Sequence, residues 1–275
     1  MQVKPHVYSV HIESGGDFHP GGSNNYFVGK PEEEMVLVDT GDHHRNWTQA
    51  ILDYYKELGQ PKISAILITH GHGDHTGGID RIHEATGAPV RCHPKLVERL
   101  GKVIGKEAVI SLRSKEVIPT GGDASLLALF TPGHEIDHVC YYLRQDRVLF
   151  TGDTVLGASS TTVHDLSSYM KSLQLLTRYK HDTICPAHGP VVLPPQGAKL
   201  VQRYINHRNQ RETQVLDAVG KGIKDVSEIV RAVYPRNLKK GLRNAAERNV
   251  DRHLRKLIKE GRVTESPAQF SLKTS

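Results

Sequence analysis

Apolar and polar residues follow two different patterns of spacing along the first two hundred residues. Short runs of branched and aromatic residues, such as "EMVLVDTG" (34–41) and "ISAILITH" (63–70), are bounded by Gly, Pro or charged residues and are typical of buried strands. Longer stretches such as "DLSSYMKSLQLLTRY" (165–179) place apolar residues three or four positions apart, as one face of a helix requires. This alternation of strands and helices predicts an α/β fold.

These two patterns of spacing predict the individual strands and helices. We expect strands within residues 26–29, 34–41, 63–70, 89–94, 125–134, 139–153 and 182–189, and helices within 46–59, 77–87 and 165–179. The first two strands should pair like a hairpin. In the first helix, Asn46 is the expected N-cap, and Gly59 lies just past the expected end.

A different pattern begins after "PVVLPPQG" (190–197), whose prolines indicate the end of the first unit. Helices are expected at roughly 199–219, 226–233 and 242–260. The last of these keeps a helical period of apolar residues, namely Leu242, Ala246, Val250, Leu254, Leu257 and Ile258. Gly261 would end it, and "RVTE" suits a short β wing. The sequence therefore predicts a large α/β domain over 1–198 and a small winged-helix-like domain over 199–275.

Charge separates the same two parts of the chain. Residues 1–198 hold 18 Lys/Arg and 22 Asp/Glu, a net charge of −4. Residues 199–275 hold 18 Lys/Arg and 8 Asp/Glu, a net charge of +10. The basic segment is either a solvated helical surface or a surface that attracts a polyanion.

The remaining composition indicates an intracellular protein. No apolar run approaches the ~18–20 residues of a membrane span. The first residues lack an apolar signal core and an Arg/Ser-rich transit pattern, so we expect the cytoplasm or the mitochondrial matrix, with no membrane partner. Cys92, Cys140 and Cys185 form an odd set without a CxxC pair and are expected to be reduced, structural thiols.

Four apolar runs end in residues that can bind a metal. They are "ILITH", "LFTPGH", "VLFTGD" and "ICPAHG", which lead to His70, His134, Asp153 and His188. Strand ends followed by short Gly/Pro loops are the places where α/β folds hold their chemistry. The four ends are therefore candidates for one shared site.

The densest candidate is "THGHGDH" (69–75), which offers three histidines and one aspartate. The H-x-H-x-D-H spacing can converge on a metal only if the backbone curls tightly, which Gly71 and Gly73 allow. Neutral imidazole and carboxylate are good ligands for Zn²⁺. Together with three of the strand-end residues, the stretch supplies about the seven donors that two zinc ions with open positions need.

The predicted site divides these donors between two zinc ions. One ion would bind His70, His72 and His134, the other would bind Asp74, His75 and His188, and Asp153 would bridge the two. Ions ~3.5–4 Å apart would share a water or hydroxide as the nucleophile, because zinc lowers the pKa of bound water to ~7. Asp74 is also the predicted catalytic residue, since it could orient this hydroxide or pass on its proton.

Other histidines lack this support, because a lone histidine is more often a packing or surface residue. We assign that role to His43, His44, His83, His93, His181, His207 and His253. His138 follows His134 by four residues, but "TPGH" places His134 at a strand end, so His134 is preferred. His164 and Tyr169 could touch a substrate, although packing is the simpler interpretation.

In order along the chain, "THGHGDHTGG", "TPGH", "TGD" and "PAHG" resemble the metal motifs of the metallo-β-lactamase superfamily, and "LVDTG" resembles its first motif. The resemblance covers roughly residues 5–195. It implies an αββα sandwich of two sheets flanked by helices, with a dinuclear site at one edge, followed here by the winged-helix-like domain. It also implies that Asp39 props the site without binding metal.

Within the superfamily, the chain departs from two branches. Lactamases of the zinc-Cys type place Cys where Asp153 stands, and flavodiiron oxygen reductases have Glu in place of His72. "GGSNNYFVG", "TTVHDLSSYMKSL" and "YINHRNQRETQVL" resemble instead the β-lactamase-like single-strand endoribonucleases that carry a C-terminal winged helix. Fungal polyketide-releasing thioesterases share many of these features.

Three functions are consistent with these observations. The leading hypothesis is a dinuclear zinc endoribonuclease that cleaves phosphodiester bonds in single-stranded RNA, with the basic C-terminal helices binding the phosphate backbone. The alternative is a thioester hydrolase for acyl-carrier, coenzyme A or glutathione thioesters. Acyl carrier protein and coenzyme A are anionic, so the basic C-terminal segment would suit them as well. The third is a nucleic-acid-binding protein with a relict hydrolase body, which the complete ligand set disfavours.

Overall fold

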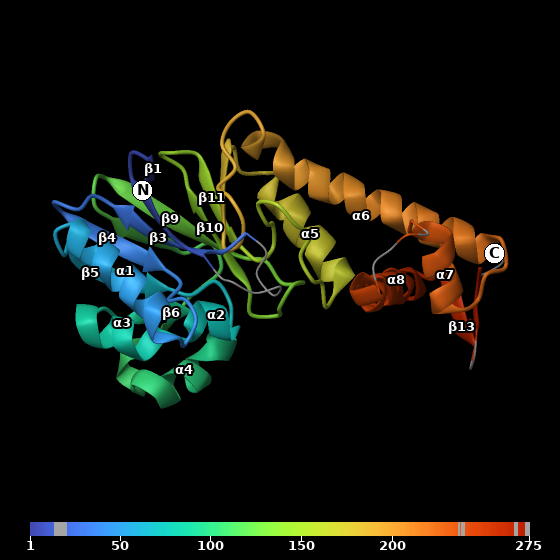
Figure 1. Ribbon diagram of the computed structural model, residues 1–275, viewed down its shortest axis with the longest axis horizontal. Helices are drawn as coiled ribbons and strands as arrows, with labels where there is room; N and C mark the ends of the chain where they lie inside the picture. The colour runs from blue at the N-terminus through green and yellow to red at the C-terminus, as the bar shows by residue number, and fades with distance from the viewer. Residues whose placement is uncertain (14–20, 236, 238–239, 267–268, 273–275) are drawn as a thin grey trace.

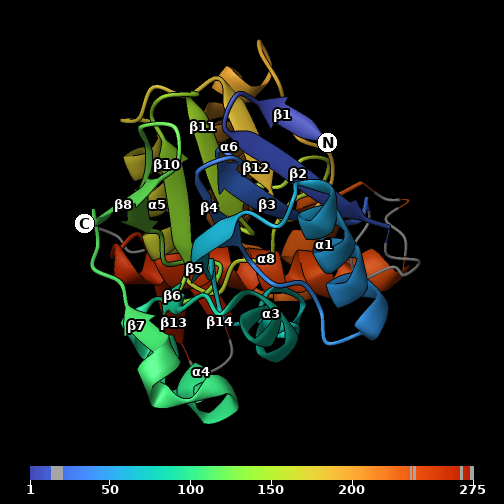
Figure 2. The same ribbon diagram turned by 90° about the vertical axis from the view of Figure 1, so that its left-hand side faces the viewer.

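Two β-sheets lie face to face with helices on both outer sides, and a long helix leads from this body to a smaller helical unit (Figure 1). This computed structural model describes residues 1–13, 21–235, 237, 240–266 and 269–272. Figure 2 shows the body from its end, with α1 on one outer side of the sheets and α5 on the other. The predicted αββα sandwich is confirmed.

The first sheet has seven strands that follow one another in sequence order. They are β1 (Gln2–Lys4), β2 (Val7–Ile12), β3 (Ser23–Gly29), β4 (Glu34–Val38), β5 (Lys62–Leu67), β6 (Val90–Cys92) and β7 (Val109–Ser111). β3 and β4 are antiparallel, as predicted, whereas β4 to β7 run parallel. The parallel strands are joined by crossovers that contain α1 (Arg45–Glu57), α2 (Gly73–Thr76), α3 (Ile79–Thr86) and α4 (Val97–Ile104).

The second sheet has five strands in the order β12-β11-β10-β9-β8. Their bounds are β8 (Val117–Thr120), β9 (Ala124–Phe130), β10 (Val139–Leu143), β11 (Val148–Gly152) and β12 (Thr183–Pro186). α5 (Leu166–Leu176) and the first half of α6 (Gly197–Gly220) cover its outer face. β11 and β12 are parallel, so their carboxyl ends lie at the same edge.

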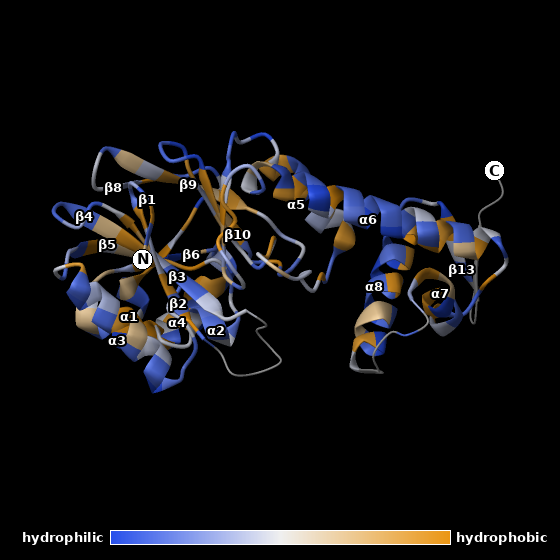
Figure 3. Ribbon diagram, turned by 45° about the horizontal axis from the view of Figure 1, so that its top comes forward, coloured by the Kyte–Doolittle hydropathy of each residue, from blue (hydrophilic) through white to orange (hydrophobic). Residues whose placement is uncertain are grey.

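The apolar core lies between the sheets and under the helices on each side. Tyr26 on β3 and Phe150 on β11 meet edge to face in the central layer, with ring centroids 5.3 Å apart. The next residue, Phe27, points the opposite way and packs beneath α1. The strands are therefore buried on both faces, which explains why they form continuous apolar runs (Figure 3).

The C-terminal unit consists of the second half of α6 with α7 (Val226–Val233), α8 (Lys240–Lys259) and the antiparallel pair β13 (Val263–Ser266) and β14 (Gln269–Leu272). Its own core includes Val215, Ile229, Val250 and Leu254. The three predicted helices and the β wing are all present.

Two smaller expectations have different outcomes. The predicted cap at Asn46 was wrong, because α1 begins at Arg45 with His44 as its N-cap, and the His44 N–H donates to Asp42 Oδ1 at 3.2 Å. The three cysteines are free and buried, and burial raises the pKa of the Cys140 thiol to about 12. Among the described residues, none of the helices is long and apolar enough to cross a membrane.

Glu212 anchors α8 against α6 in the C-terminal unit. Its Oε2 lies 2.7 Å from Lys256 Nζ, and its Oε1 lies 3.2 Å from Arg262 Nη1. Burial alone would raise the pKa of this carboxyl, but hydrogen bonds from His253 and Lys256 hold the pKa at about 2. Because the pKa is depressed in the folded state, its contribution to stability is present above the ordinary Glu value of ~4.3 and is lost as pH falls toward about 2.

We predict that Glu212→Gln lowers the stability of the C-terminal unit at pH 7 by about 1–3 kcal/mol, because charge-assisted hydrogen bonds are lost. Its difference from the unsubstituted protein should shrink as the pH falls toward about 2. Urea denaturation followed by circular dichroism measures both effects. The control Glu228→Gln removes the same charge from the exposed face of α7 and should change stability by less than about 0.5 kcal/mol. Equal effects of the two substitutions would contradict this role of Glu212.

Candidate metal centre

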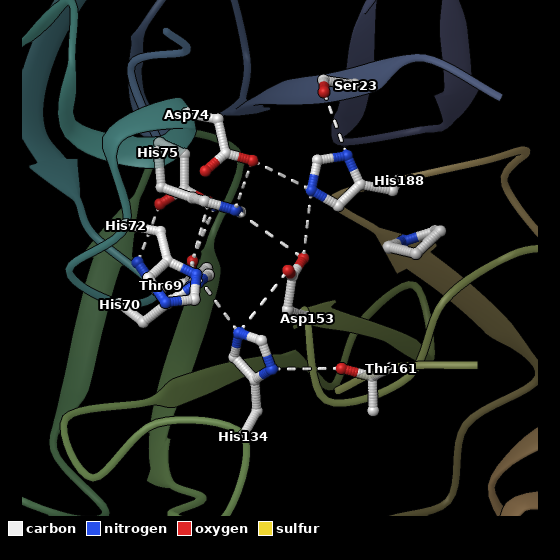
Figure 4. A network of polar contacts seen from close by, with 12 residues as sticks. Ser23, Thr69, His70, His72, Asp74, His75, His134, Asp153, Thr161 and His188 are labelled. Atoms are coloured by element: carbon white, nitrogen blue, oxygen red, sulfur yellow. Dashed lines mark hydrogen bonds and ion pairs between the residues drawn. The ribbon is translucent and has the colours of Figure 1, made fainter. Parts of the chain in front are cut away.

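Loops from both sheets meet at one edge of the sandwich and bring the predicted residues together (Figure 4). The segment after β5, including the single turn α2, carries four of them, and the loops after β9, β11 and β12 carry the other three. The seven residues form two groups: His70, His72, His134 and Asp153, and Asp74, His75 and His188. In each group, the donor atoms all lie within 4.8 Å of one another.

Asp153 lies between the two groups. Its Oδ2 is 3.6 Å from His134 Nε2, whereas its Oδ1 is 3.3 Å from His188 Nε2 and 3.7 Å from His75 Nε2. One carboxylate oxygen thus faces each group, which is the arrangement that a bridging ligand requires.

The backbone turn at residues 70–75 differs from the predicted one. Neither Gly71 nor Gly73 has a positive φ, so the turn does not depend on conformations that favour glycine. The chain instead starts a helix, and His72 O accepts hydrogen bonds from the N–H groups of His75 and Thr76. A Cβ at Gly71 would lie 2.8 Å from Leu96 Cδ2, so a larger residue there would require this side chain to shift.

Asp39 orients His75, as the resemblance implied. His75 Nδ1 donates to Asp39 Oδ2 at 2.7 Å, and Thr69 donates to Asp39 through both its N–H and its hydroxyl, each at 2.8 Å. Asp39 directly follows β4 and has a φ of 61°, a left-handed conformation that is uncommon for residues other than glycine. With Nδ1 held in this way, Nε2 of His75 faces the donor group.

Three other imidazoles are oriented by similar contacts. His134 Nδ1 donates to Thr162 O at 2.7 Å, and His188 Nδ1 lies 3.0 Å from Ser23 Oγ. These contacts turn the Nε2 atoms inward. In His72 the two ring nitrogens have the opposite roles. Its Nε2 faces outward, 3.0 Å from Glu135 Oε1, and its Nδ1 lies 2.9 Å from His70 Nε2.

The electrostatics of the site fit a divalent cation. Burial would lower the pKa of His75, but the carboxylates of Asp39 and Asp74 raise it well above its ordinary value. His75 Nε2 and Asp153 Oδ1 are buried without a hydrogen-bond partner among the described residues. A metal ion would satisfy both atoms and supply the positive charge that these carboxylates favour. The His/Asp donor set therefore suits a divalent metal.

Three further residues show what the sequence did and did not reveal. His138 lies outside both donor groups, and its Nε2 accepts the Asp153 N–H at 3.1 Å. Tyr169 is fully buried, and its hydroxyl donates to Thr154 O at 2.6 Å, so it packs and does not face a substrate. His164 is exposed at the rim, with Nε2 3.4 Å from Glu135 Oε1.

The sequence did not single out Glu135 and Thr161, although both contact proposed ligands. Glu135 contacts His72, and Thr161 Oγ1 lies 3.1 Å from His134 Nδ1. Only the position of Glu135, directly after "TPGH", could have indicated the first contact. No sequence signal indicated the second.

Comparisons with known proteins agree with this architecture. The profile of the Metallo-beta-lactamase superfamily matches residues 19–188, and that of the Beta-lactamase associated winged helix domain matches residues 226–269. A metallo-beta-lactamase family protein from Thermus thermophilus is 22% identical, with a TM-score of 0.73 over 98% of this chain and 99% of that one. A beta-lactamase domain protein from Burkholderia ambifaria is 17% identical, with a TM-score of 0.79 over 99% of this chain and 94% of that one.

Curated relatives are more similar in sequence. The "Atrochrysone carboxyl ACP thioesterase" of Passalora fulva is 34% identical over 95% of this chain and 78% of that protein. A protein of the same name from Aspergillus chevalieri is 34% identical over 85% of this chain and 75% of that protein.

These relatives overturn the predicted endoribonuclease activity and the predicted single-stranded RNA partner, because their names describe thioesterases of an ACP. The net charge of the C-terminal segment was misleading, since it does not show how each basic side chain is used. Lys256 and Arg262 pair with Glu212, and Arg208 is buried. The fold, the two matched profiles and the relatives agree that this chain belongs to the metallo-beta-lactamase superfamily, whose hydrolase body is joined here to the associated winged helix domain.

Proposed function

We propose that this chain is a metal-dependent thioester hydrolase that releases an acyl group from an acyl carrier protein. The observation that carries the proposal is the 34% identity, over 95% of the chain, to an ACP thioesterase. The two adjacent donor groups support it, because they suit a hydrolytic dinuclear site. We propose zinc, two ions per chain, since imidazole and carboxylate are both common zinc ligands.

In the proposed site, residues of the chain would hold the ions and set their positions. His70, His72 and His134 would hold one ion, Asp74, His75 and His188 the other, and Asp153 both. Bound zinc supplies a water with a pKa of ~7 and a Lewis acid that polarises the thioester carbonyl. Asp39, Thr162 and Ser23 fix three of the imidazoles, so the ligands need little reorganisation when a substrate binds.

The reaction needs no nucleophilic side chain. The oxygen of water forms a bond to the acyl carbon, the carbon–sulfur bond breaks, and the departing thiolate takes up a proton. Asp74, whose Oδ2 lies 3.1 Å from His188 Nε2, would orient the attacking water and accept its proton. Glu135 and His164 stand at the rim, where the arm of a substrate would enter.

The zinc-loaded protein should hydrolyse an acylated carrier protein, with release of its thiol followed by a colorimetric reagent. Removal of zinc by a chelator should abolish the activity, and added zinc should restore it, because no side chain acts as the nucleophile in the proposed reaction. Single-stranded RNA should remain intact under the same conditions. Absence of hydrolysis of acyl-carrier, coenzyme A and glutathione thioesters by fully loaded protein would refute the proposed function.

Substitution of Asp153, the proposed bridging ligand, should lower zinc content and activity more than substitution of a residue that only contacts a ligand. Asp153→Asn should leave at most about one zinc per chain and lower kcat/KM by more than about 100-fold. This loss exceeds the ~10–100-fold that is typical when a residue that only orients a metal ligand is replaced. Metal analysis by mass spectrometry and thioester kinetics measure these effects. The control Asp53→Asn, on the exposed face of α1, should keep two zinc ions and full activity. Full zinc content in Asp153→Asn would argue against a bridge.

Asp39 should affect zinc affinity through His75. Asp39→Asn preserves the left-handed backbone, which Asn tolerates, but weakens the charged contact to His75 Nδ1. We predict zinc affinity about 10–100-fold lower in competition with a chromophoric chelator, with the thermal unfolding of the chain still cooperative. Unchanged affinity would show that Asp39 does not support the site.

A further inference from the structure

A cavity of about 340 Å³ lies between α6 and the loop that follows β11. Ser159 and Ser160 line it from the loop, and Arg203, Tyr204 and His207 line it from α6. The lining positions on α6 recur at helical spacing, so they form one stripe that faces the loop. No carboxylate belongs to this lining within the described part of the chain.

Arg208 adds a buried charge to the same cavity. Its side chain belongs to a residue only 4% exposed. Nη2 donates to Thr161 O at 3.0 Å and Nη1 donates to Asn249 Oδ1 at 3.1 Å, while the guanidinium lies 5.5 Å from the ring centroid of Tyr169. Nε has no hydrogen-bond partner among the described residues, and none of their carboxylates pairs with this guanidinium. A buried cation without a counter-charge is unfavourable, and a bound anion would offset that cost.

The cavity is separated from the candidate metal centre by a single loop. Thr161, whose carbonyl accepts the hydrogen bond from Arg208, also places its hydroxyl 3.1 Å from His134 Nδ1. Tyr204 binds the same loop, since its hydroxyl accepts the Leu156 N–H at 3.0 Å. A ligand that occupies the cavity would therefore lie across this loop from His134.

We propose that this cavity binds the phosphate of a 4′-phosphopantetheine thioester, the arm through which acyl carrier proteins and coenzyme A hold acyl groups. This inference rests on the proposed thioester hydrolysis. Arg203 matches a phosphate because guanidinium–phosphate hydrogen bonds are charge-assisted, and the buried Arg208 adds a second positive charge beside it. The hydroxyls of Ser159 and Ser160 add donors, and Tyr204 offers apolar surface to the carbon chain of the arm. The volume far exceeds the ~10–15 Å³ that one water needs, so a phosphate with part of the arm fits.

Two substrates that differ only in the phosphate test this proposal. We expect the zinc-loaded protein to hydrolyse S-acetyl-4′-phosphopantetheine with a kcat/KM at least tenfold higher than S-acetylpantetheine, mainly through a lower KM. Arg203→Gln should remove most of this preference without changing the kinetics of S-acetylpantetheine. Arg203→Lys should restore part of it, because a cation returns without the planar guanidinium. Lys199→Gln, one turn away on the same helix but outside the cavity lining, removes the same charge and should keep the full preference.

A binding measurement separates this proposal from the proposed function. Calorimetry with amide analogues, in which nitrogen replaces the thioester sulfur, reports recognition of the phosphate without any reaction. Tighter binding of the phosphorylated analogue, lost in Arg203→Gln, supports the phosphate site even if no thioester is hydrolysed. Equal binding of the two analogues, or an equal effect of Arg203→Gln and Lys199→Gln, overturns it even if hydrolysis is rapid.

Two further substrates identify the source of the phosphate. Acetylated acyl carrier protein and acetyl-coenzyme A both contain the arm. A loss of kcat/KM in Arg203→Gln with the carrier alone assigns the carrier-bound phosphate, and a loss with both assigns the arm in either setting. A loss with neither overturns the proposal.

Discussion

The carboxylate of Asp153 faces two groups of imidazoles at once, and this position depends on how the two sheets pack. Asp153 follows β11 in the second sheet, whereas His75 follows β5 in the first. The 3.7 Å contact between Asp153 Oδ1 and His75 Nε2 therefore exists only while the core between Tyr26 and Phe150 keeps the sheets in register. Because packed interiors deform little, the apolar sandwich sets the geometry of a polar site that lies outside it.

The C-terminal unit is linked to this site through a buried path and is more than an attached basic module. Arg208 on α6 binds the carbonyl of Thr161, and the hydroxyl of Thr161 contacts His134. The basic segment that was predicted to bind RNA thus directs its one deeply buried arginine, among the residues that the structure describes, toward the loop beside the metal centre. On our account, its positive charge recognises the phosphate of a substrate arm.

Much of the fold and of the donor set could be predicted from the sequence, for physical reasons. Strands and helices leave periodic patterns, and the carboxyl ends of neighbouring strands converge, so His134, Asp153 and His188 could be grouped with residues 70–75 from the sequence alone. Contacts such as that of Thr161 depend on tertiary packing, which leaves no local signal. The RNA prediction failed because it rested on net charge, which does not distinguish one anionic partner from another, and on motifs that endoribonucleases share with thioesterases.

The most direct test of the account is anomalous X-ray diffraction at the zinc edge from crystals of the zinc-loaded protein. We predict two peaks ~3.5–4 Å apart. One should lie among His70, His72 and His134, the other among Asp74, His75 and His188, with Asp153 contacting both. A single peak, or zinc bound instead at the exposed group of Asp42, His43 and His44, would contradict a dinuclear centre at this edge of the sandwich.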